Sequence, residues 1–316
     1  MEAMNRANAA VVGIQVTAIE DARSAESLGL NRTGSGVVIA TDGLVLTIGY
    51  LILEAEQIEI VTQDNKVLPA MAVAYDIATG FGLVKPLLPL RVAPVKLGSV
   101  RDLTPGEPLM AATGASGGGI NDADGGVSMT QLVSLRPFSG AWEYHLDTAL
   151  FTSPPVISGR GNHSGAPLFN QKGELVGIGS LLVLDAAGDN RRMPGNMFVP
   201  VDLLKPILQE LRQTGSSRQS HRPWLGLTSS DRSGRVQILR IAADSPAEDA
   251  GLQPGVVVLA VDGSEVSTLE AFYKKLWAHA VPNEPIRLTV LQDSEVKTIV
   301  LKPQDRMLML KKPSGI

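Results

Sequence analysis

The sequence contains no cysteine, and this absence excludes disulfide bonds, a thiolate nucleophile and cysteine-ligated zinc. It does not identify the compartment, because a cysteine-free chain suits either redox environment. Aromatic residues are also scarce, at 4%, so the hydrophobic cores must be built mainly from aliphatic side chains. Only four histidines are present, and they show no metal-ligand spacing. The sequence therefore predicts no metal and no other cofactor.

Neither sign of charge dominates. Lys and Arg number 28 and Asp and Glu number 32, which gives a formal net charge of 28 − 32 = −4. Nucleic-acid binding usually needs a clustered basic surface, so this balance argues against nucleic acid as a partner. The apolar fraction of 44% is normal for a globular chain and excludes wholesale disorder.

Long hydrophobic runs are missing as well. The most apolar early stretch, residues 44–53, is about half as long as the roughly 20 residues that a membrane-spanning helix needs. Residues 1–10 contain no basic region followed by an apolar core, which is the pattern of a signal peptide. We therefore expect no membrane span and no signal peptide in this chain. This expectation leaves open a leader that processing has removed.

The chain is 316 residues long, which predicts two or three domains. Its first two-thirds contain short runs rich in Val, Ile and Leu between turn formers, a pattern typical of a sandwich or barrel. One set of runs lies at 11–16, 36–40, 44–47, 58–62, 71–74 and 82–85. A second set lies at 108–112, 127–135, 143–147, 166–169, 175–183 and 197–199. Two such sets predict two small barrels packed together.

A different organisation begins after residue 200. Apolar residues at helical spacing predict a helix over residues 201–213, followed by a polar, exposed linker at 214–220. A third unit begins at about residue 222, with predicted strands at 235–241 and 256–261 and a helix near 268–280. The chain therefore divides into a double barrel (8–200), a helix and linker (201–221), a third domain (222–303) and a loosely ordered tail (304–316).

A candidate nucleophile lies at Ser164, within the segment Gly-Asn-His-Ser-Gly-Ala-Pro-Leu at residues 161–168. A serine between glycines, at a tight turn leading into a strand, is how an exposed nucleophile is presented. The neighbouring backbone N–H groups can then form an oxyanion hole. Ser-Gly turns are common, however, and most are only turns. The motif by itself therefore favours an ordinary turn.

Six further motifs occur in order around this serine. They are Thr-Gly-Ser-Gly-Val-Val-Ile at 33–39, Asp-Gly-Leu-Val-Leu-Thr at 42–47, the Asp-x-x-Thr turn at 76–79, Pro-Gly-Glu at 105–107, Gly-Glu-Leu-Val-Gly-Ile at 173–178 and Phe-Val-Pro at 198–200. Together with the Ser164 motif they resemble the HtrA family, which are trypsin-like serine proteases with a C-terminal PDZ domain. The resemblance implies a mainly β fold, in which a trypsin-like double β-barrel is followed by an α+β PDZ domain.

The resemblance also implies where a catalytic triad would lie, and the sequence departs from it there. Ser164 retains the nucleophile position, while Tyr50 stands in place of the general-base histidine and Gly80 in place of the orienting aspartate. A serine hydroxyl is a poor nucleophile until a neighbouring base removes its proton. A phenol, with a pKa of about 10, stays protonated at neutral pH, and loss of triad members costs about 10⁴ to 10⁶ in turnover. We therefore expect no efficient hydrolysis by the usual route.

The oxyanion hole is assigned by the same resemblance to the backbone N–H groups of Asn162, His163 and Ser164. The family usually has glycine where this chain has Asn162. Because asparagine tolerates a positive φ better than most residues, the turn can persist with this substitution.

Other bases are poorly placed to serve Ser164. His163 adjoins Ser164, but neighbouring side chains on a turn generally diverge. Lys85 matches an ordinary strand-end lysine of the family. His145 lies in a predicted strand, while His221 and His279 lie in the predicted linker and last helix. None of the four histidines stands where the resemblance puts the base.

The segment Trp224, Leu225, Gly226 and Leu227 resembles the loop with which PDZ domains hold a peptide carboxylate. The resemblance implies that a peptide would add as a strand after Leu227, with its carboxylate held by backbone N–H groups. One wall of the groove would be a helix carrying Leu269, Phe272, Tyr273 and Leu276. The alternative is that these helix residues face the core of their own domain.

These observations favour an HtrA-like pseudoprotease that binds unfolded polypeptides or protein C-termini through its PDZ groove. Such binding would give the protein a role in protein quality control. The alternative is an active serine endopeptidase that uses Ser164 with a non-standard base, and a third class is a scaffold whose groove binds nothing. The resemblance implies an extracytoplasmic, periplasmic location and allows a homotrimer.

Overall fold

The computed structural model describes residues 2–115, 126–156, 163–188, 192–278 and 282–311. The chain separates into two compact units. The first comprises Met1–Arg136, Thr148–Ser217 and Leu310–Ile316, and the second comprises Pro137–Asp147 and Arg218–Met309. A hairpin end from the middle of the sequence therefore belongs to the same unit as the C-terminal domain, and each unit is described by itself.

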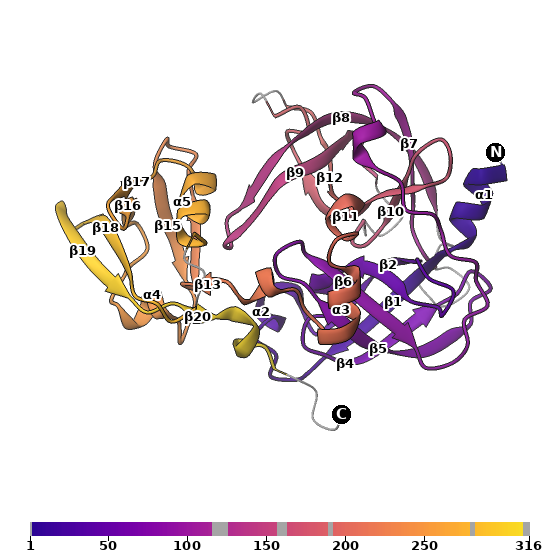
Figure 1. The fold of residues 1–316 in the computed structure, drawn as a ribbon, viewed down its shortest axis with the longest axis horizontal. Helices are drawn as coiled ribbons and strands as arrows, with labels where there is room; N and C mark the ends of the chain where they lie inside the picture. The colour runs from indigo at the N-terminus through magenta and orange to yellow at the C-terminus, as the bar shows by residue number, and fades with distance from the viewer. Residues whose placement is uncertain (1, 116–125, 157–162, 189–191, 279–281, 312–316) are drawn as a thin grey trace. The chain divides into compact units, whose positions relative to one another are not determined.

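The first closed barrel has the strand order β1-β2-β3-β6-β5-β4 (Figure 1). Its strands are β1 (Val11–Ala18), β2 (Asn31–Val38), β3 (Val45–Ile48), β4 (Ala55–Val61), β5 (Val67–Tyr75) and β6 (Phe81–Pro86). The aliphatic runs form strands because β-branched and apolar side chains fill the interior of a small barrel. Leu46, Ile48 and Leu83 are almost entirely buried there.

The second closed barrel has the strand order β10-β11-β12-β9-β8-β7. Its strands are β7 (Pro108–Ala112), β8 (Val127–Gly140), β9 (Tyr144–Ser153), β10 (Pro167–Phe169), β11 (Leu175–Val183) and β12 (Gly195–Pro200). Leu109, Leu150 and Phe198 are among the buried residues of its core. Every predicted run of both sets coincides with at least part of a strand, and the predicted double barrel is confirmed.

The helix predicted over residues 201–213 was wrong in its first half. A 3₁₀ turn, η3 (Val201–Leu203), comes first, and the α-helix α3 begins only at Leu208 and ends at Thr214. Pro206 explains the interruption, because proline lacks an N–H group and disfavours helical backbone in the residue before it. Gly215, with φ 82°, caps α3 by donating its N–H to the Leu211 carbonyl.

The linker predicted as exposed at residues 214–220 is exposed only in part. Ser217 and Ser220 are 2% and 1% exposed, and Ser217 donates both its N–H and its hydroxyl to the carboxylate of Asp76. Polar side chains can be buried when they have internal hydrogen-bond partners. The absence of apolar residues therefore did not make every residue of this run exposed.

The second unit contains a sheet in the order β14-β15-β16-β18-β19, with β17 paired to β16. Its strands are β14 (Leu227–Ser230), β15 (Val236–Ile241), β16 (Val257–Val261), β17 (Ser264–Glu265), β18 (Ile286–Gln292) and β19 (Glu295–Leu301), while β13 (Pro223–Trp224) pairs with β20 (Gln304–Asp305). Two helices, α4 (Pro246–Asp249) and α5 (Leu269–Leu276), begin at the side-chain caps Ser245 and Thr268. Helix α5 is shorter than predicted, and residues 279–280 of that prediction lie outside the described residues.

Short helices complete the two units. They are α1 (Glu2–Ala9), α2 (Ala25–Leu28), η1 (Gly49–Leu51), η2 (Val100–Asp102), η4 (Arg218–His221) and η5 (Arg306–Met309). The tail predicted as loosely ordered contains both β20 and η5, and Lys311 donates its N–H to Glu54 at 3.0 Å. The described part of the tail is therefore more ordered than predicted.

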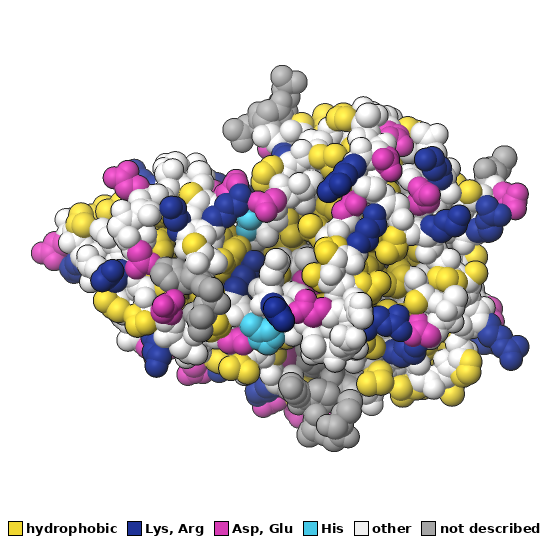
Figure 2. Space-filling view, viewed as in Figure 1, with side chains coloured by type: hydrophobic (Ala, Val, Ile, Leu, Met, Phe, Trp, Pro, Cys, Tyr) yellow, Lys and Arg dark blue, Asp and Glu magenta, His cyan; other side chains and the backbone are white. Residues whose placement is uncertain are grey.

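Charged side chains of both signs are interspersed over the face seen in Figure 2. This distribution agrees with the near balance of charge in the sequence. Among the described residues, no helix combines the length and the apolar character needed to cross a membrane.

Candidate functional site

Ser164 lies in a tight turn just before β10. The turn closes with a hydrogen bond from Ala166 N–H to the His163 carbonyl at 3.1 Å, and Gly165 N–H donates to the Gly179 carbonyl at 2.8 Å. Gly165 has φ 74°, a left-handed conformation that glycine adopts without steric cost. The predicted turn-and-strand presentation of the serine therefore has a defined backbone.

This turn packs tightly against β2. The Ser35 N–H donates to the Ser164 carbonyl at 2.9 Å, and the Thr47 hydroxyl donates to the Ser35 carbonyl at 2.7 Å. A Cβ atom at Gly165 would lie 2.0 Å from the Ser35 carbonyl oxygen, and one at Gly34 would lie 2.7 Å from the Ser164 carbonyl oxygen. Glycine at both positions is what allows a turn of the second barrel to touch the first barrel this closely.

Tyr50, in η1 directly after β3, points at the serine. Its Oη lies 2.7 Å from Ser164 Oγ and 2.8 Å from the Ser180 carbonyl oxygen. A phenol has one proton, and a carbonyl oxygen can only accept a hydrogen bond. When the proton points at Ser180, the phenolic oxygen is left as an acceptor for the Ser164 hydroxyl. The pair is thus held in a short chain of hydrogen bonds that ends on a backbone carbonyl.

Burial raises the pKa of the Tyr50 phenol to about 12, and the hydrogen bond with Ser164 only partly offsets this shift. The charged phenolate is the form that burial disfavours. Tyr50 therefore remains protonated at neutral pH, as the sequence predicted from the ordinary pKa of tyrosine.

Gly80 lies at the end of a turn before β6 and has φ 84°. Its N–H donates to the Asp76 carbonyl, and its own carbonyl accepts from Gly49 N–H, both at 2.7 Å. The nearby Asp76 carboxylate accepts hydrogen bonds from Thr79 and Ser217. This carboxylate is fully buried and holds the turn together, so it is already bound to groups other than Tyr50.

Three of the other bases named from the sequence have partners elsewhere. Lys85 Nζ lies 2.7 Å from Asp42. His145 lies 2.9 Å from the Ser139 hydroxyl and 3.2 Å from Asp147, while His221 lies 2.6 Å from Asp305. His163 contributes its carbonyl to the serine turn. Asn162, assigned to the oxyanion hole, and His279 lie outside the described residues.

One group of described side chains, His145, Asp147 and Glu270, has the spacing of a possible metal site. Lys274 Nζ already lies 2.8 Å from a carboxylate oxygen of Asp147 and 2.8 Å from one of Glu270. A metal cation would have to displace this ammonium group, so the cluster is better described as a set of ion pairs.

The segment predicted to bind a peptide carboxylate forms the loop between β13 and β14. Gly226 has φ 87°, and a Cβ atom there would lie 2.3 Å from Ser245 Cβ. The N–H groups of Leu225, Gly226 and Leu227 all donate to a single carboxylate, that of Glu143. The sequence did not identify Glu143 as a functional residue and placed it only as the first residue of the strand predicted at 143–147.

The predicted helix wall is deeply buried. Phe272 and Leu276 on α5 have no exposed surface and belong to the core of the second unit, together with Leu225 and Leu227. Their core role is therefore evident, and contact with a peptide stays a prediction for them. Trp224 is partly buried and pairs with Gln304 across β13 and β20.

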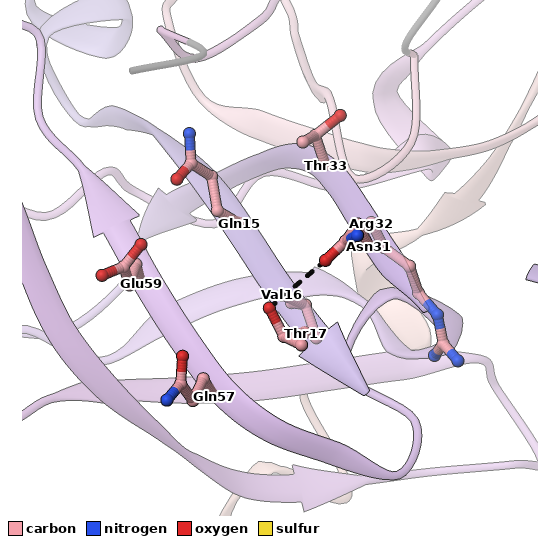
Figure 3. Close-up of a pocket in the computed structure, with 8 residues that line it drawn as sticks. All are labelled: Gln15, Val16, Thr17, Asn31, Arg32, Thr33, Gln57 and Glu59. Atoms are coloured by element: carbon pink, nitrogen blue, oxygen red, sulfur yellow. Dashed lines mark hydrogen bonds between the residues drawn. The ribbon is translucent and has the colours of Figure 1, made fainter. Parts of the chain in front are cut away.

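A separate surface hollow lies on the first barrel, over β1, β2 and β4 (Figure 3). Thr17 and Asn31 are joined across it by a side-chain hydrogen bond of 3.4 Å. Its lining is mostly polar and comprises Gln15, Val16, Thr17, Asn31, Arg32, Thr33, Gln57 and Glu59. These residues include no nucleophile with an adjacent base, so the Ser164 region remains the candidate active site.

The fold has counterparts among known proteins. Residues 34–178 match the family of trypsin-like peptidase domains, and residues 223–302 match the family of PDZ domains. The chain is 26% identical to serine endoprotease DegS of Haemophilus influenzae, over 87% of this chain and 77% of the relative. It is 27% identical to a probable periplasmic serine endoprotease DegP-like of Ectopseudomonas mendocina, over 88% of this chain and 56% of the relative. The chain therefore spans little more than half of that second protein.

Among solved structures, the HtrA-type protease AlgW with a bound tripeptide is similar, with a TM-score of 0.58 and 21% identity over 99% of this chain and 98% of that one. The likeness establishes a shared fold. Fold and sequence together define this protein as a trypsin-like peptidase domain followed by a PDZ domain. The relatives that it resembles in sequence are named serine endoproteases DegS and DegP-like, and the solved structure that shares its fold is named an HtrA-type protease.

Proposed function

We propose that this chain is an HtrA-type pseudoprotease, which keeps the serine of the family but has lost the means to activate it. The observation that carries the proposal is the hydrogen bond of 2.7 Å between Tyr50 and Ser164. Activation requires a neighbouring base to take the serine proton as the new bond forms. A phenol with a raised pKa is already protonated and provides no such base.

The surroundings of Tyr50 support the same proposal. Gly80, at the position assigned to the orienting aspartate, has no side chain to hold or charge-stabilise a base. Tyr50 is itself held by the Ser180 carbonyl at 2.8 Å, so its ring is fixed beside the serine. When the phenolic proton is donated to the Ser180 carbonyl, the Ser164 hydroxyl donates to a phenolic oxygen that is only weakly basic.

The proposed activity is peptide binding by the PDZ domain. Its loop at Leu225–Leu227 presents three N–H groups to one carboxylate, which is the chemistry needed to hold the C-terminus of a peptide. Strand β14 is at the edge of its sheet, so an extended chain can pair with it. We therefore propose unfolded polypeptides or protein C-termini as ligands, in line with the tripeptide bound by AlgW.

The setting of this activity is proposed from the relatives. Several are named periplasmic serine endoproteases, which supports an extracytoplasmic location and a role in protein quality control. A homotrimer is proposed on the family resemblance alone.

Labelling with a fluorophosphonate probe tests the loss of catalysis. The parent protein is expected to stay unlabelled, like a Ser164→Ala control, under conditions in which trypsin is labelled completely. Labelling of the parent that disappears in Ser164→Ala would instead support the alternative, an active serine endopeptidase with a non-standard base. The well-formed turn at Ser164 and Gly165 supports this alternative, because it presents the serine as an active enzyme would.

A further inference from the structure

The tip of the β8–β9 hairpin has an unusual backbone for its sequence. Strand β8 ends at Gly140 and β9 begins at Tyr144, so the turn consists of three residues, of which the last is Glu143. Glu143 has φ 57°, the left-handed position where three-residue hairpins usually place glycine. A glutamate held there costs energy that its side chain or neighbours must offset.

The side chain of Glu143 provides that compensation. Glu143 is 3% exposed, and its carboxylate accepts N–H groups from Leu225 at 3.0 Å, Gly226 at 2.8 Å and Leu227 at 2.7 Å. A buried carboxylate is costly unless hydrogen bonds satisfy it, and this one has three backbone donors. It lies where the proposed function puts the terminal carboxylate of a peptide.

The backbone of the tip also pairs with β14. Ser229 N–H donates to the Ala141 carbonyl at 2.8 Å. Alternate residues of a strand point their N–H groups to the same edge, and Leu227 and Ser229 both direct theirs at the tip. Since β14 has a sheet neighbour on only one side, β15, the tip contacts the edge that an added strand would use.

Helix α5 holds the other side of the tip. The Tyr273 hydroxyl donates to the Gly140 carbonyl at 2.8 Å and accepts the Glu143 N–H at 3.2 Å. Arg306 Nη1 donates to the Trp142 carbonyl at 3.3 Å. The Trp142 ring stacks on Tyr144, with centroids 5.9 Å apart. Each residue from Gly140 to Glu143 therefore has a backbone or side-chain hydrogen bond to the C-terminal domain.

We propose that the hairpin tip, residues 140–143, is an internal ligand of the PDZ groove, with Glu143 occupying the carboxylate-binding loop, and that a peptide C-terminus binds only by displacing it. This inference rests on the proposed peptide-binding function. Both occupants use the same N–H groups of Leu225, Gly226 and Leu227, so they exclude one another. Because the tip belongs to the same chain, it competes at a high effective concentration, and the apparent affinity for a peptide falls in proportion to the fraction of open groove.

Glu143→Gly is the informative variant, because glycine suits φ 57° and preserves the turn while removing the carboxylate. Glu143→Gln keeps the size of the side chain and removes its charge. Glu265→Ala, which removes an exposed carboxylate from the same unit, is the matched control. All are compared in the full-length chain, with circular dichroism to check folding.

Two measurements are made on each protein. The first is binding of a fluorescent decapeptide library with free, randomised C-terminal residues, against the same library with amidated C-termini. We expect Glu143→Gly to bind the free library about tenfold or more tightly than the parent, Glu143→Gln to lie between them and Glu265→Ala to match the parent. The amidated library should show no such gain, because it lacks the competing carboxylate.

The second measurement is amide hydrogen exchange of residues 225–227. These amides should be protected in the parent and exchange faster in Glu143→Gly, whether or not any peptide binds. Faster exchange without peptide binding would support the internal ligand while contradicting the proposed peptide-binding function. Equal library affinity of parent and Glu143→Gly, or amides that are unprotected in the parent, would overturn the internal ligand and leave the peptide-binding proposal intact.

Discussion

Tyr50 Oη lies 2.7 Å from Ser164 Oγ, and the same phenolic oxygen lies 2.8 Å from the Ser180 carbonyl. The serine therefore has a hydrogen-bonding neighbour in the place where the family resemblance puts its base. That neighbour has a pKa raised by burial, so it restrains the hydroxyl without activating it.

Replacing this phenol with an imidazole should begin to restore reactivity. We expect Tyr50→His to be labelled by the fluorophosphonate about tenfold or more above the background of the Ser164→Ala control, since a general base contributes about 10² to 10⁴. Adding Gly80→Asp should increase the labelling rate further, because a carboxylate at this position orients the imidazole. Aspartate also tolerates positive φ better than most residues. Tyr50→Phe, which frees the serine without supplying a base, is the control and should stay unlabelled. Equal labelling of the Phe and His variants would contradict the role given to the base.

Tyr50 should also affect stability at high pH. Its pKa is raised from about 10 in the unfolded chain to about 12 in the folded one. The corresponding stability is present below about pH 10 and is lost as the pH rises through 12, because only the unfolded state ionises in between. The free energy of unfolding should fall by about 1.4 kcal/mol from this group by about pH 11. Urea unfolding at both ends of this range measures it, and Tyr50→Phe should show a correspondingly smaller loss.

The serine turn should be intolerant of any side chain at Gly165. A Cβ atom there would lie 2.0 Å from the Ser35 carbonyl oxygen, in a residue with φ 74°. We expect Gly165→Ala to lower the free energy of unfolding by about 3 kcal/mol, from backbone strain plus the clash. Gly106→Ala is the matched control, since Gly106 has φ 89° and open space around it; it should cost only about 1 kcal/mol. Similar losses in the two variants would mean that the turn can move away from β2.

Asp76 should prove structural. Its buried carboxylate accepts from Thr79 and from Ser217, so Asp76→Asn leaves donors without a charged acceptor. The expected loss is about 2 to 3 kcal/mol, measured by urea unfolding. Asp64→Asn, at an exposed aspartate, should leave the midpoint nearly unchanged. An unchanged midpoint in Asp76→Asn would show that these hydrogen bonds do not stabilise the turn.

Tyr273 should help to retain the hairpin tip. Tyr273→Phe removes the hydroxyl that contacts both Gly140 and Glu143 and keeps the ring in the core. We expect binding of the free C-terminal library to strengthen about threefold to tenfold, consistent with the loss of about 1 kcal/mol of hydrogen bonding from the closed state. The ring stacking of Tyr273 on Trp277 should persist, so thermal unfolding monitored by tryptophan fluorescence is the control. Weaker library binding with unchanged stability would argue that Tyr273 contacts the peptide itself.

Much of the fold was predictable because strand formation depends on local patterns. The runs at residues 44–47 and 82–85 each contain adjacent aliphatic residues, and such segments are stable as strands in many tertiary settings. Errors came where a local pattern had competing causes. The apolar spacing after residue 200 suggested one helix, but Pro206 divided it. Within the polar run that follows, Ser217 is buried because Asp76 accepts its hydrogen bonds.

The site divides in the same way. The sequence by itself determined which residues are present: a serine in a glycine-bounded turn, a tyrosine and a glycine at the other two triad positions, and a Leu-Gly-Leu loop at residues 225–227. Only the tertiary structure decided that Tyr50 contacts Ser164, 114 residues away in sequence, and that Glu143 contacts Gly226, 83 residues away. Hydrogen bonds act over about 3 Å, and no local pattern specifies which distant side chain will complete a buried donor or acceptor.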